Sequence, residues 1–147
     1  MKEIARYSGC FICGDQNEHG LQVKFYAKDG AAVAECTAKR HFEGYRDIYH
    51  GGMTASLLDE VMIKALLARD IFAMTVEMTV HFRKAVYIGQ KLRLEGTIER
   101  QRGRLYLTRG EARLETGEIV ATATGKYLEV KEGMKGKLLE SIERSSD

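Results

Sequence analysis

The residues with the clearest chemical potential are His50-Gly51-Gly52 and Asp59, nine residues after the histidine. Two glycines at a helix start let the backbone approach a ligand closely, because neither has a Cβ. The free N–H groups of a first helical turn, with the positive end of the helix dipole, suit an oxyanion or a polarised carbonyl. A tight loop-to-helix turn is the simpler explanation of the glycines, so this pattern needs support from other residues.

Asp59 is the candidate for proton transfer. No cation lies among its helical neighbours, which are Ala55, Ser56, Met62 and Ile63. A carboxylate on an enclosed helix is strongly unfavourable unless it is hydrogen-bonded or opens into a solvated cleft. Such carboxylates concentrate at functional sites as general bases, but an arginine at a subunit contact would satisfy Asp59 equally well. Spacing alone leaves both interpretations open.

The other residues with chemical potential have structural interpretations. Glu60 has Lys64 four residues on, which predicts an i,i+4 ion pair on a solvated stripe of the helix. Cys10 and Cys13 form one C-x-x-C pair, and His19 is the only other soft ligand close by, whereas a structural zinc site needs four ligands. We therefore expect the two cysteines to pack at the start of the domain, and we predict no metal site.

The element that must position Asp59 is a helix from Gly52 to about Arg69. Its apolar residues recur at helical spacing and cover most of its circumference: Met53, Leu57, Leu58, Val61, Met62, Ala65 and Leu66. A helix that is apolar on most sides is enclosed by other elements.

Alternating apolar and polar residues predict the strands that enclose it. Leu21 to Lys28 and Ala31 to Lys39 precede the helix and are joined by Asp29-Gly30, a strong hairpin signal. Four strands follow it: Met74 to Phe82, about Leu92 to Ile98, Arg104 to Glu115 and Glu118 to Val130. Short links imply antiparallel neighbours, so the expected class is α+β, with one antiparallel sheet wrapped around one helix.

Composition excludes several classes of function. The chain has 23 Lys and Arg against 21 Asp and Glu, and a net charge of +2 is too balanced for a dedicated nucleic-acid or membrane-surface binder. No apolar run approaches the roughly 20 residues that span a bilayer, and the first residues lack the hydrophobic segment of a secretory signal. We expect a cytoplasmic protein with no nucleic-acid or membrane partner.

His50-Gly51-Gly52 followed by Leu57-Leu58-Asp59-Glu60 resembles the signature of hotdog-fold acyl-CoA thioesterases of the PaaI-like type. The resemblance covers about residues 10 to 130 and includes Cys10-Phe11-Ile12-Cys13-Gly14, Phe42-Glu43-Gly44-Tyr45 and Phe82-Arg83. It implies a hotdog fold, a homodimer that is often a tetramer, and hydrolysis of acyl-CoA thioesters without a cofactor, since coenzyme A is part of the substrate. The expected domain is single and spans 1–147, with a short tail or helix over 131–147.

The resemblance also assigns roles by position. Asp59 matches the catalytic carboxylate, Gly52 matches the residue whose N–H polarises the thioester carbonyl, and Thr75 matches a hydroxyl that positions water in some members. Ile63 stands where other members carry a hydroxyl one turn beyond the carboxylate, so any such role would fall to Thr75 or Ser56. Substrate contacts are expected from His50, Gly51, Met53, Arg83 and Lys84. The plainer alternatives are a solvated Thr75, a His50 bonded to loop backbone and basic residues on a solvated sheet face.

Helix geometry predicts that the site is shared between two subunits. Gly52 and Asp59 are seven residues apart, which is about 10 Å along a helix axis. An attacking water and the carbonyl must approach within about 3 to 3.5 Å. Two antiparallel copies can bring Gly52 of one subunit to Asp59 of the other across a two-fold axis.

Two other functions remain open from the sequence. One is an acyl-CoA-binding hotdog module without turnover, because a fold does not by itself assign chemistry. The other is a hydratase or dehydratase of hydroxyacyl thioesters, in which His50 and Asp59 would converge on one substrate. The spacing from the glycines to Asp59 favours the thioesterase.

Overall fold

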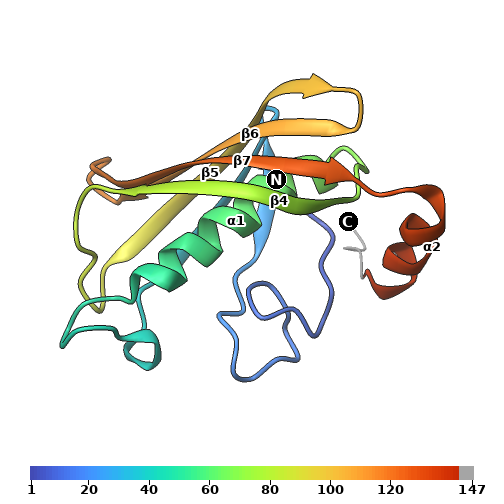
Figure 1. Cartoon of the computed structure of the whole chain (residues 1–147). Coiled ribbons are helices and arrows are strands. Elements are labelled where there is room, and N and C mark those ends of the chain that lie inside the picture. The colour runs from blue at the N-terminus through green and yellow to red at the C-terminus, as the bar shows by residue number, and fades with distance from the viewer. Residues whose placement is uncertain (143–147) are drawn as a thin grey trace.

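One long helix, α1 (Gly51–Leu67), lies against the concave face of a curled antiparallel sheet (Figure 1). The computed structural model describes residues 1–142, so the last five residues of the predicted tail, 143–147, lie outside the described residues. The strands are β1 (Lys2–Glu3), β2 (Phe25–Lys28), β3 (Ala31–Thr37), β4 (Ala73–Phe82), β5 (Lys91–Arg102), β6 (Leu105–Leu114) and β7 (Ile119–Glu129). A short 3-10 helix, η1 (Arg40–Phe42), precedes α1, and α2 (Glu132–Ser141) follows β7.

The predicted central helix forms because its apolar side chains are fully enclosed. Leu57, Leu58, Val61 and Met62 are completely buried in the core. The helix packs closely on the sheet at Gly96 of β5, where a Cβ would lie 2.3 Å from the Val61 carbonyl oxygen. Backbone therefore packs directly on backbone at this point, and only glycine leaves the room for it.

The sheet is antiparallel throughout, as predicted, but the predicted pairing of the strand after the helix with the next strand in sequence is wrong. The strand order is β1-β2-β3-β5-β6-β7-β4, so β4 pairs with β7 instead of with β5, which follows it in sequence. The connection over residues 83–90 passes the N-terminal end of α1, where the Tyr49 N–H donates to the Val86 carbonyl at 2.8 Å. The chain thus crosses the end of the helix between β4 and β5. The two strands are separated in the sheet by β6 and β7, and β4 lies at its edge.

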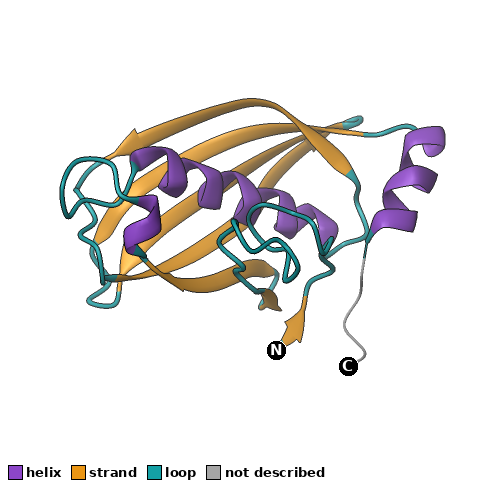
Figure 2. Ribbon diagram, turned by 90° about the horizontal axis from the view of Figure 1, so that it is seen from below, coloured by secondary structure: helices purple, strands orange, loops and turns teal. Residues whose placement is uncertain are grey.

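The first predicted strand is shorter than expected. Gln22 has a φ of 55°, which interrupts the extended backbone, and β2 begins only at Phe25. The N–H groups of Leu21 and Val23 instead donate to the carbonyls of Phe11 and Ile12. The irregular N-terminal segment, residues 4–24, thereby covers the part of α1 that faces away from the sheet (Figure 2).

The edge strand β4 is more exposed than its alternating pattern predicts. Met74, Val76 and Phe82 are 53%, 60% and 58% exposed, although all three are apolar. No strand within residues 1–142 pairs with the outer side of β4. Long, apolar, unpaired edges are avoided in isolated domains, so this edge is suited to pairing with another chain. None of the helices formed within residues 1–142 has the length and apolarity that a membrane span requires.

Candidate active site

Asp59 lies in the middle of α1, half-buried, and accepts two hydrogen bonds on the same carboxylate oxygen. The Thr75 hydroxyl donates to Asp59 Oδ1 at 2.9 Å, and the Tyr127 hydroxyl donates to it at 2.7 Å. Thr75 and Tyr127 are directly opposite one another in the β4–β7 ladder, so their side chains lie on the same face of the sheet. Thr75, which the family resemblance predicts as a water-positioning hydroxyl, therefore contacts Asp59 directly, and sequence reasoning missed Tyr127.

Tyr127 is a fixed donor to this carboxylate. Its side chain is fully buried, and its hydroxyl also donates to the Asp59 backbone carbonyl at 3.2 Å. Burial raises the pKa of Tyr127, and the neighbouring Asp59 charge raises it further, so the phenol keeps its proton. In the sequence Tyr127 is one inward-facing residue of a strand, and nothing local indicates that it reaches a helix 68 residues away.

The two hydroxyls leave the second carboxylate oxygen available. Asp59 Oδ2 has no hydrogen-bond partner among residues 1–142, while Oδ1 is held on both sides. A carboxylate oriented through one oxygen can accept a proton from water with the other.

The glycine turn is present, but its second N–H is occupied. His50 is the N-cap of α1, and its Nδ1 accepts a hydrogen bond from the Gly52 N–H at 2.9 Å. The Gly51 N–H makes no hydrogen bond to any residue in the described part of the chain. A Cβ at Gly52 would lie 3.0 Å from His50 Nδ1, so a side chain there would displace the imidazole.

A cavity of about 320 Å³ lies beside this turn. Gly51, Arg83 and Lys84, all predicted to contact substrate, line it together with Phe82 of β4. Met53, predicted to do the same, is half-buried against the core and does not line the cavity. Asp59 does not line the cavity either. Within a single chain, the glycine turn and the Asp59 carboxylate therefore do not share this cavity.

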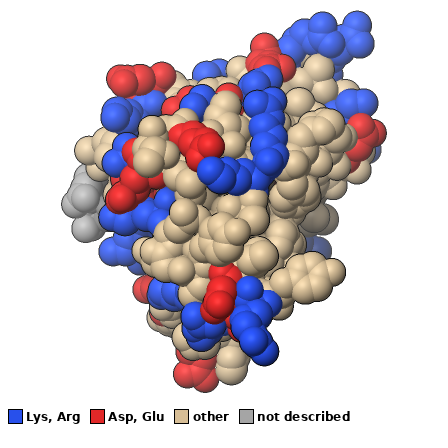
Figure 3. Space-filling model, turned by 90° about the vertical axis from the view of Figure 1, so that its left-hand side faces the viewer, with Lys and Arg blue, Asp and Glu red and all other residues tan. Residues whose placement is uncertain are grey.

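Several basic residues, beside the cavity and on the strands, are paired with acidic residues. Lys84 pairs with Glu118 at 2.7 Å, and on the strands Arg93 pairs with Glu35 and Arg113 with Glu111. Figure 3 views the end of the molecule at the left of Figure 1 and shows basic and acidic side chains interspersed. Arg83 has no ion-pair partner within residues 1–142, which leaves its guanidinium available.

Glu60 and Lys64 do not lie on a solvated stripe as predicted. Their ion pair forms, with 3.9 Å between Lys64 Nζ and Glu60 Oε2, but the two side chains are only 3% and 16% exposed. The N-terminal segment covers them: Lys64 donates to the Ala5 carbonyl, and Cys10 Sγ lies 3.7 Å from Glu60 Oε2. Burial raises the pKa of Glu60 to about 7.

Comparison with known proteins assigns the chain to a family. Residues 47–121, half of the chain, match the model of the thioesterase superfamily. The chain belongs to this superfamily, and the matched segment includes α1, Asp59 and the glycine turn. No curated protein sequence matches the chain.

Three solved structures share the fold at low sequence identity. A thioesterase superfamily protein has a TM-score of 0.78 at 23% identity, over 83% of this chain but only 61% of its own length. The Escherichia coli PaaI protein from the phenylacetic acid degradation operon has a TM-score of 0.71 at 20% identity, over 76% of this chain and 81% of its own. A hypothetical thioesterase of Streptococcus pneumoniae with coenzyme A has a TM-score of 0.69 at 17% identity, over 74% and 85%. These likenesses confirm the predicted hotdog fold.

Proposed function

We propose that the chain hydrolyses acyl-CoA thioesters, with Asp59 as the catalytic carboxylate. The observation that carries the proposal is the carboxylate itself, which Thr75 and Tyr127 hold through Oδ1 while Oδ2 stays open. A superfamily fold with this group on its central helix supports hydrolysis more than passive binding. Two further structures of the Streptococcus pneumoniae thioesterase are alanine mutants of an aspartate and a threonine sixteen residues apart, the separation of Asp59 and Thr75.

The proposed reaction begins with proton transfer to Asp59. Asp59 Oδ2 takes a proton from water as the water oxygen bonds to the thioester carbon, which becomes tetrahedral and negatively charged at oxygen. The intermediate collapses, the carbon–sulfur bond breaks, and the coenzyme A thiolate recovers the proton from Asp59. In the alternative course, Asp59 attacks directly and forms a mixed anhydride, which water then hydrolyses. Both courses yield the free acid and coenzyme A.

The negative oxygen of the intermediate would be stabilised at the start of α1. The Gly51 N–H is available there, and the Gly52 N–H becomes available when the substrate carbonyl replaces His50 Nδ1. Backbone donors aimed at a developing oxyanion contribute a few kcal/mol of barrier lowering. This role for Gly52 also gives His50 a function, since the imidazole satisfies the N–H between turnovers.

A homodimer with shared sites would bring these two parts together. Thr75, which holds Asp59, lies near the start of β4, and Phe82, beside Gly51, lies at its end. If two β4 strands pair antiparallel about a two-fold axis, the start of one strand lies beside the end of the other. Asp59 of one subunit then faces the glycine turn of its partner, and the exposed apolar edge is covered.

Coenzyme A is the proposed carrier of the acyl group. Arg83 and Lys84 beside the cavity can contact its phosphates, since both are exposed cations next to the glycine turn. Arg83→Ala should raise KM with little change in kcat, because phosphate contacts are made equally in the ground and transition states.

The experiment is a hydrolysis screen over acyl-CoA thioesters with short, medium, long and aryl acyl groups, with release of free thiol as the readout. We expect turnover that depends on the acyl group and that disappears in Asp59→Asn. Binding of acyl-CoA without thiol release by any thioester would instead support the non-catalytic module. The hydratase alternative would need His50 as a proton-transfer group, whereas His50 Nδ1 accepts a hydrogen bond from the Gly52 N–H. The same thioester panel tests it: hydration of an enoyl thioester without thiol release would support a hydratase.

A further inference from the structure

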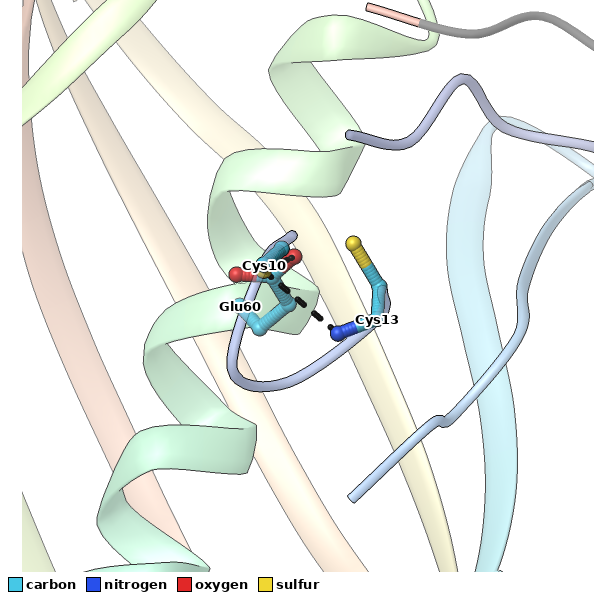
Figure 4. Close-up of side chains that lie close together, drawn as sticks. All are labelled: Cys10, Cys13 and Glu60. Carbon is cyan, nitrogen blue, oxygen red and sulfur yellow. Dashed lines mark hydrogen bonds between the residues drawn. The ribbon is translucent and has the colours of Figure 1, made fainter. Parts of the chain in front are cut away.

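We propose that Cys10, Cys13 and Glu60 bind one zinc ion, which fastens the N-terminal segment to helix α1. Their three ligand atoms all lie within 4.8 Å of one another, although Glu60 is 50 residues from Cys10 in sequence. Figure 4 shows Glu60 reaching from α1 to the turn that carries both cysteines. Two thiolates and a carboxylate are a donor set that zinc accepts. The sequence-based expectation of simple packing did not include Glu60.

The spacing of the ligand atoms already suits a tetrahedral ion. Bonds of about 2.3 Å to sulfur and about 2.0 Å to oxygen separate the two kinds of ligand atom by roughly 3.5 Å in a tetrahedron. Cys10 Sγ and Glu60 Oε2 are 3.7 Å apart. Small side-chain movements therefore suffice to close the site, with a water molecule in the fourth position.

The cysteine turn is built to present a thiolate. The N–H groups of Ile12 and Cys13 both donate to Cys10 Sγ, each at 3.4 Å. The Gly14 N–H closes the turn on the Cys10 carbonyl at 2.9 Å, and a Cβ at Gly14 would lie 2.3 Å from the Ser8 carbonyl. A thiolate accepts such N–H hydrogen bonds more strongly than a thiol does. Such contacts orient a metal ligand and favour its charged form.

The charges of the three ligands and Lys64 are those that a bound dication would balance. Cys10, Cys13 and Glu60 are three acidic groups in a covered position, and Lys64 is the cation beside them. With all three acids ionised, Lys64 leaves a charge of −2, which one zinc ion neutralises. Buried ionised groups require such compensation. A disulfide between Cys10 and Cys13 would not explain why Glu60 lies beside both sulfurs. A metal ion would explain it, because the carboxylate would be its third ligand.

The test is a metal titration of the full chain, independent of any activity. The protein is stripped with a chelator under reducing conditions and titrated with Co²⁺, whose absorption reports tetrahedral geometry and thiolate bonding. We expect one equivalent to bind and to be displaced by Zn²⁺. Cys10→Ser and Cys13→Ser, which each keep one thiol, should bind more weakly and lose about half or more of the thiolate band, and Glu60→Gln should bind about 10-fold or more weakly. The matched control is Cys36→Ser, which removes the half-buried thiol of β3 outside the cluster and should bind normally.

Thermal unfolding followed by circular dichroism separates loss of the site from loss of the fold. Zinc should raise the Tm of the wild type and of Cys36→Ser, because it binds only the native state. It should leave the Tm of a folded Cys13→Ser unchanged. The proposal is overturned if reduced wild-type protein gives no cobalt band, or if Cys10→Ser keeps the full band. Unchanged cobalt affinity in Glu60→Gln, which retains both thiols, would equally overturn it.

Discussion

At the scale of single residues, the Asp59 carboxylate is the group on which turnover should depend. Asp59→Asn keeps an oxygen that can accept from Thr75 and Tyr127, so the fold should persist. The amide cannot take a proton, and kcat should fall on the order of 10² to 10⁴. Steady-state kinetics on the best thioester measures this loss.

Asp29→Asn is the matched control for that variant. Asp29 is exposed in the β2–β3 turn with a φ of 50°, a conformation that asparagine also tolerates. It should leave kcat and the circular dichroism spectrum unchanged. An active Asp59→Asn enzyme would remove Asp59 from the catalytic role.

Tyr127 should act as a positioning residue for Asp59. Tyr127→Phe removes the 2.7 Å hydrogen bond to Oδ1, so the carboxylate is oriented less firmly by the remaining bond from Thr75. We expect kcat to fall roughly 10-fold or more with little change in KM, because misplaced groups lose reactivity. The free energy of unfolding should fall by about 1–3 kcal/mol, since the bond is made to a charged group.

The control for Tyr127→Phe is Tyr106→Phe. Tyr106 is also buried and lies opposite Tyr127 in the β6–β7 ladder, but it makes no hydrogen bond to Asp59. Its substitution should leave kcat unchanged, as measured on the same thioester. Equal losses in the two variants would mean that Tyr127 acts through core packing alone.

At the scale of elements, the distance between α1 and the sheet depends on Gly96. In Gly96→Ala the added methyl would lie 2.3 Å from the Val61 carbonyl oxygen, so helix or strand must shift. Overpacking of this kind costs about 1–3 kcal/mol of unfolding free energy. Chemical denaturation measures this loss, and the control is Gly136→Ala, at a helical glycine with open space around it.

Gly136 of α2 has open space where its Cβ would lie. Because alanine is the better helix former, Gly136→Ala should stabilise the protein by about 0.5–1 kcal/mol if α2 unfolds with the domain. A Gly96→Ala protein as stable as the wild type would contradict direct backbone packing of α1 on β5.

The exposed edge strand should control association. Val76→Asp places a charge on the apolar edge of β4, where pairing with a second copy would bury it. We expect the dimer to dissociate in sedimentation velocity and thioester hydrolysis to disappear, while the far-ultraviolet circular dichroism is kept. Leu139→Asp, at another exposed apolar position, on α2, should keep both the dimer and the activity. Dimers of Val76→Asp with full activity would place the interface elsewhere.

At the scale of the whole molecule, composite sites predict complementation between two inactive variants. Asp59→Asn lacks the base, and Gly52→Val displaces His50 and blocks the glycine turn. In a mixed dimer one site carries both lesions and the other carries neither, so hydrolysis should partly return. The variants are unfolded and refolded together, and heterodimers are isolated with two affinity tags. Inactive heterodimers would show that each site is complete within one chain.

The sequence by itself determined the elements of this protein and the identity of its candidate base. Helical spacing between Met53 and Leu66 and alternation in the later strands are local consequences of burial on one side, so α1 and most strands lie where the periodicity predicts. Thr75 was also singled out, though from a family resemblance and as a water-positioning hydroxyl; its hydrogen bond to Asp59 was not predicted.

Only the tertiary structure decided which distant groups meet. The pairing of β4 with β7 depends on the path of residues 83–90 around the helix end, and this pairing is what places Tyr127 beside Thr75. Glu60 looked solvated because its local partner Lys64 explained it, yet the N-terminal segment covers both and brings Cys10 to the carboxylate. Such contacts join residues far apart in sequence. Because they depend on how the whole chain packs, local sequence patterns do not predict them.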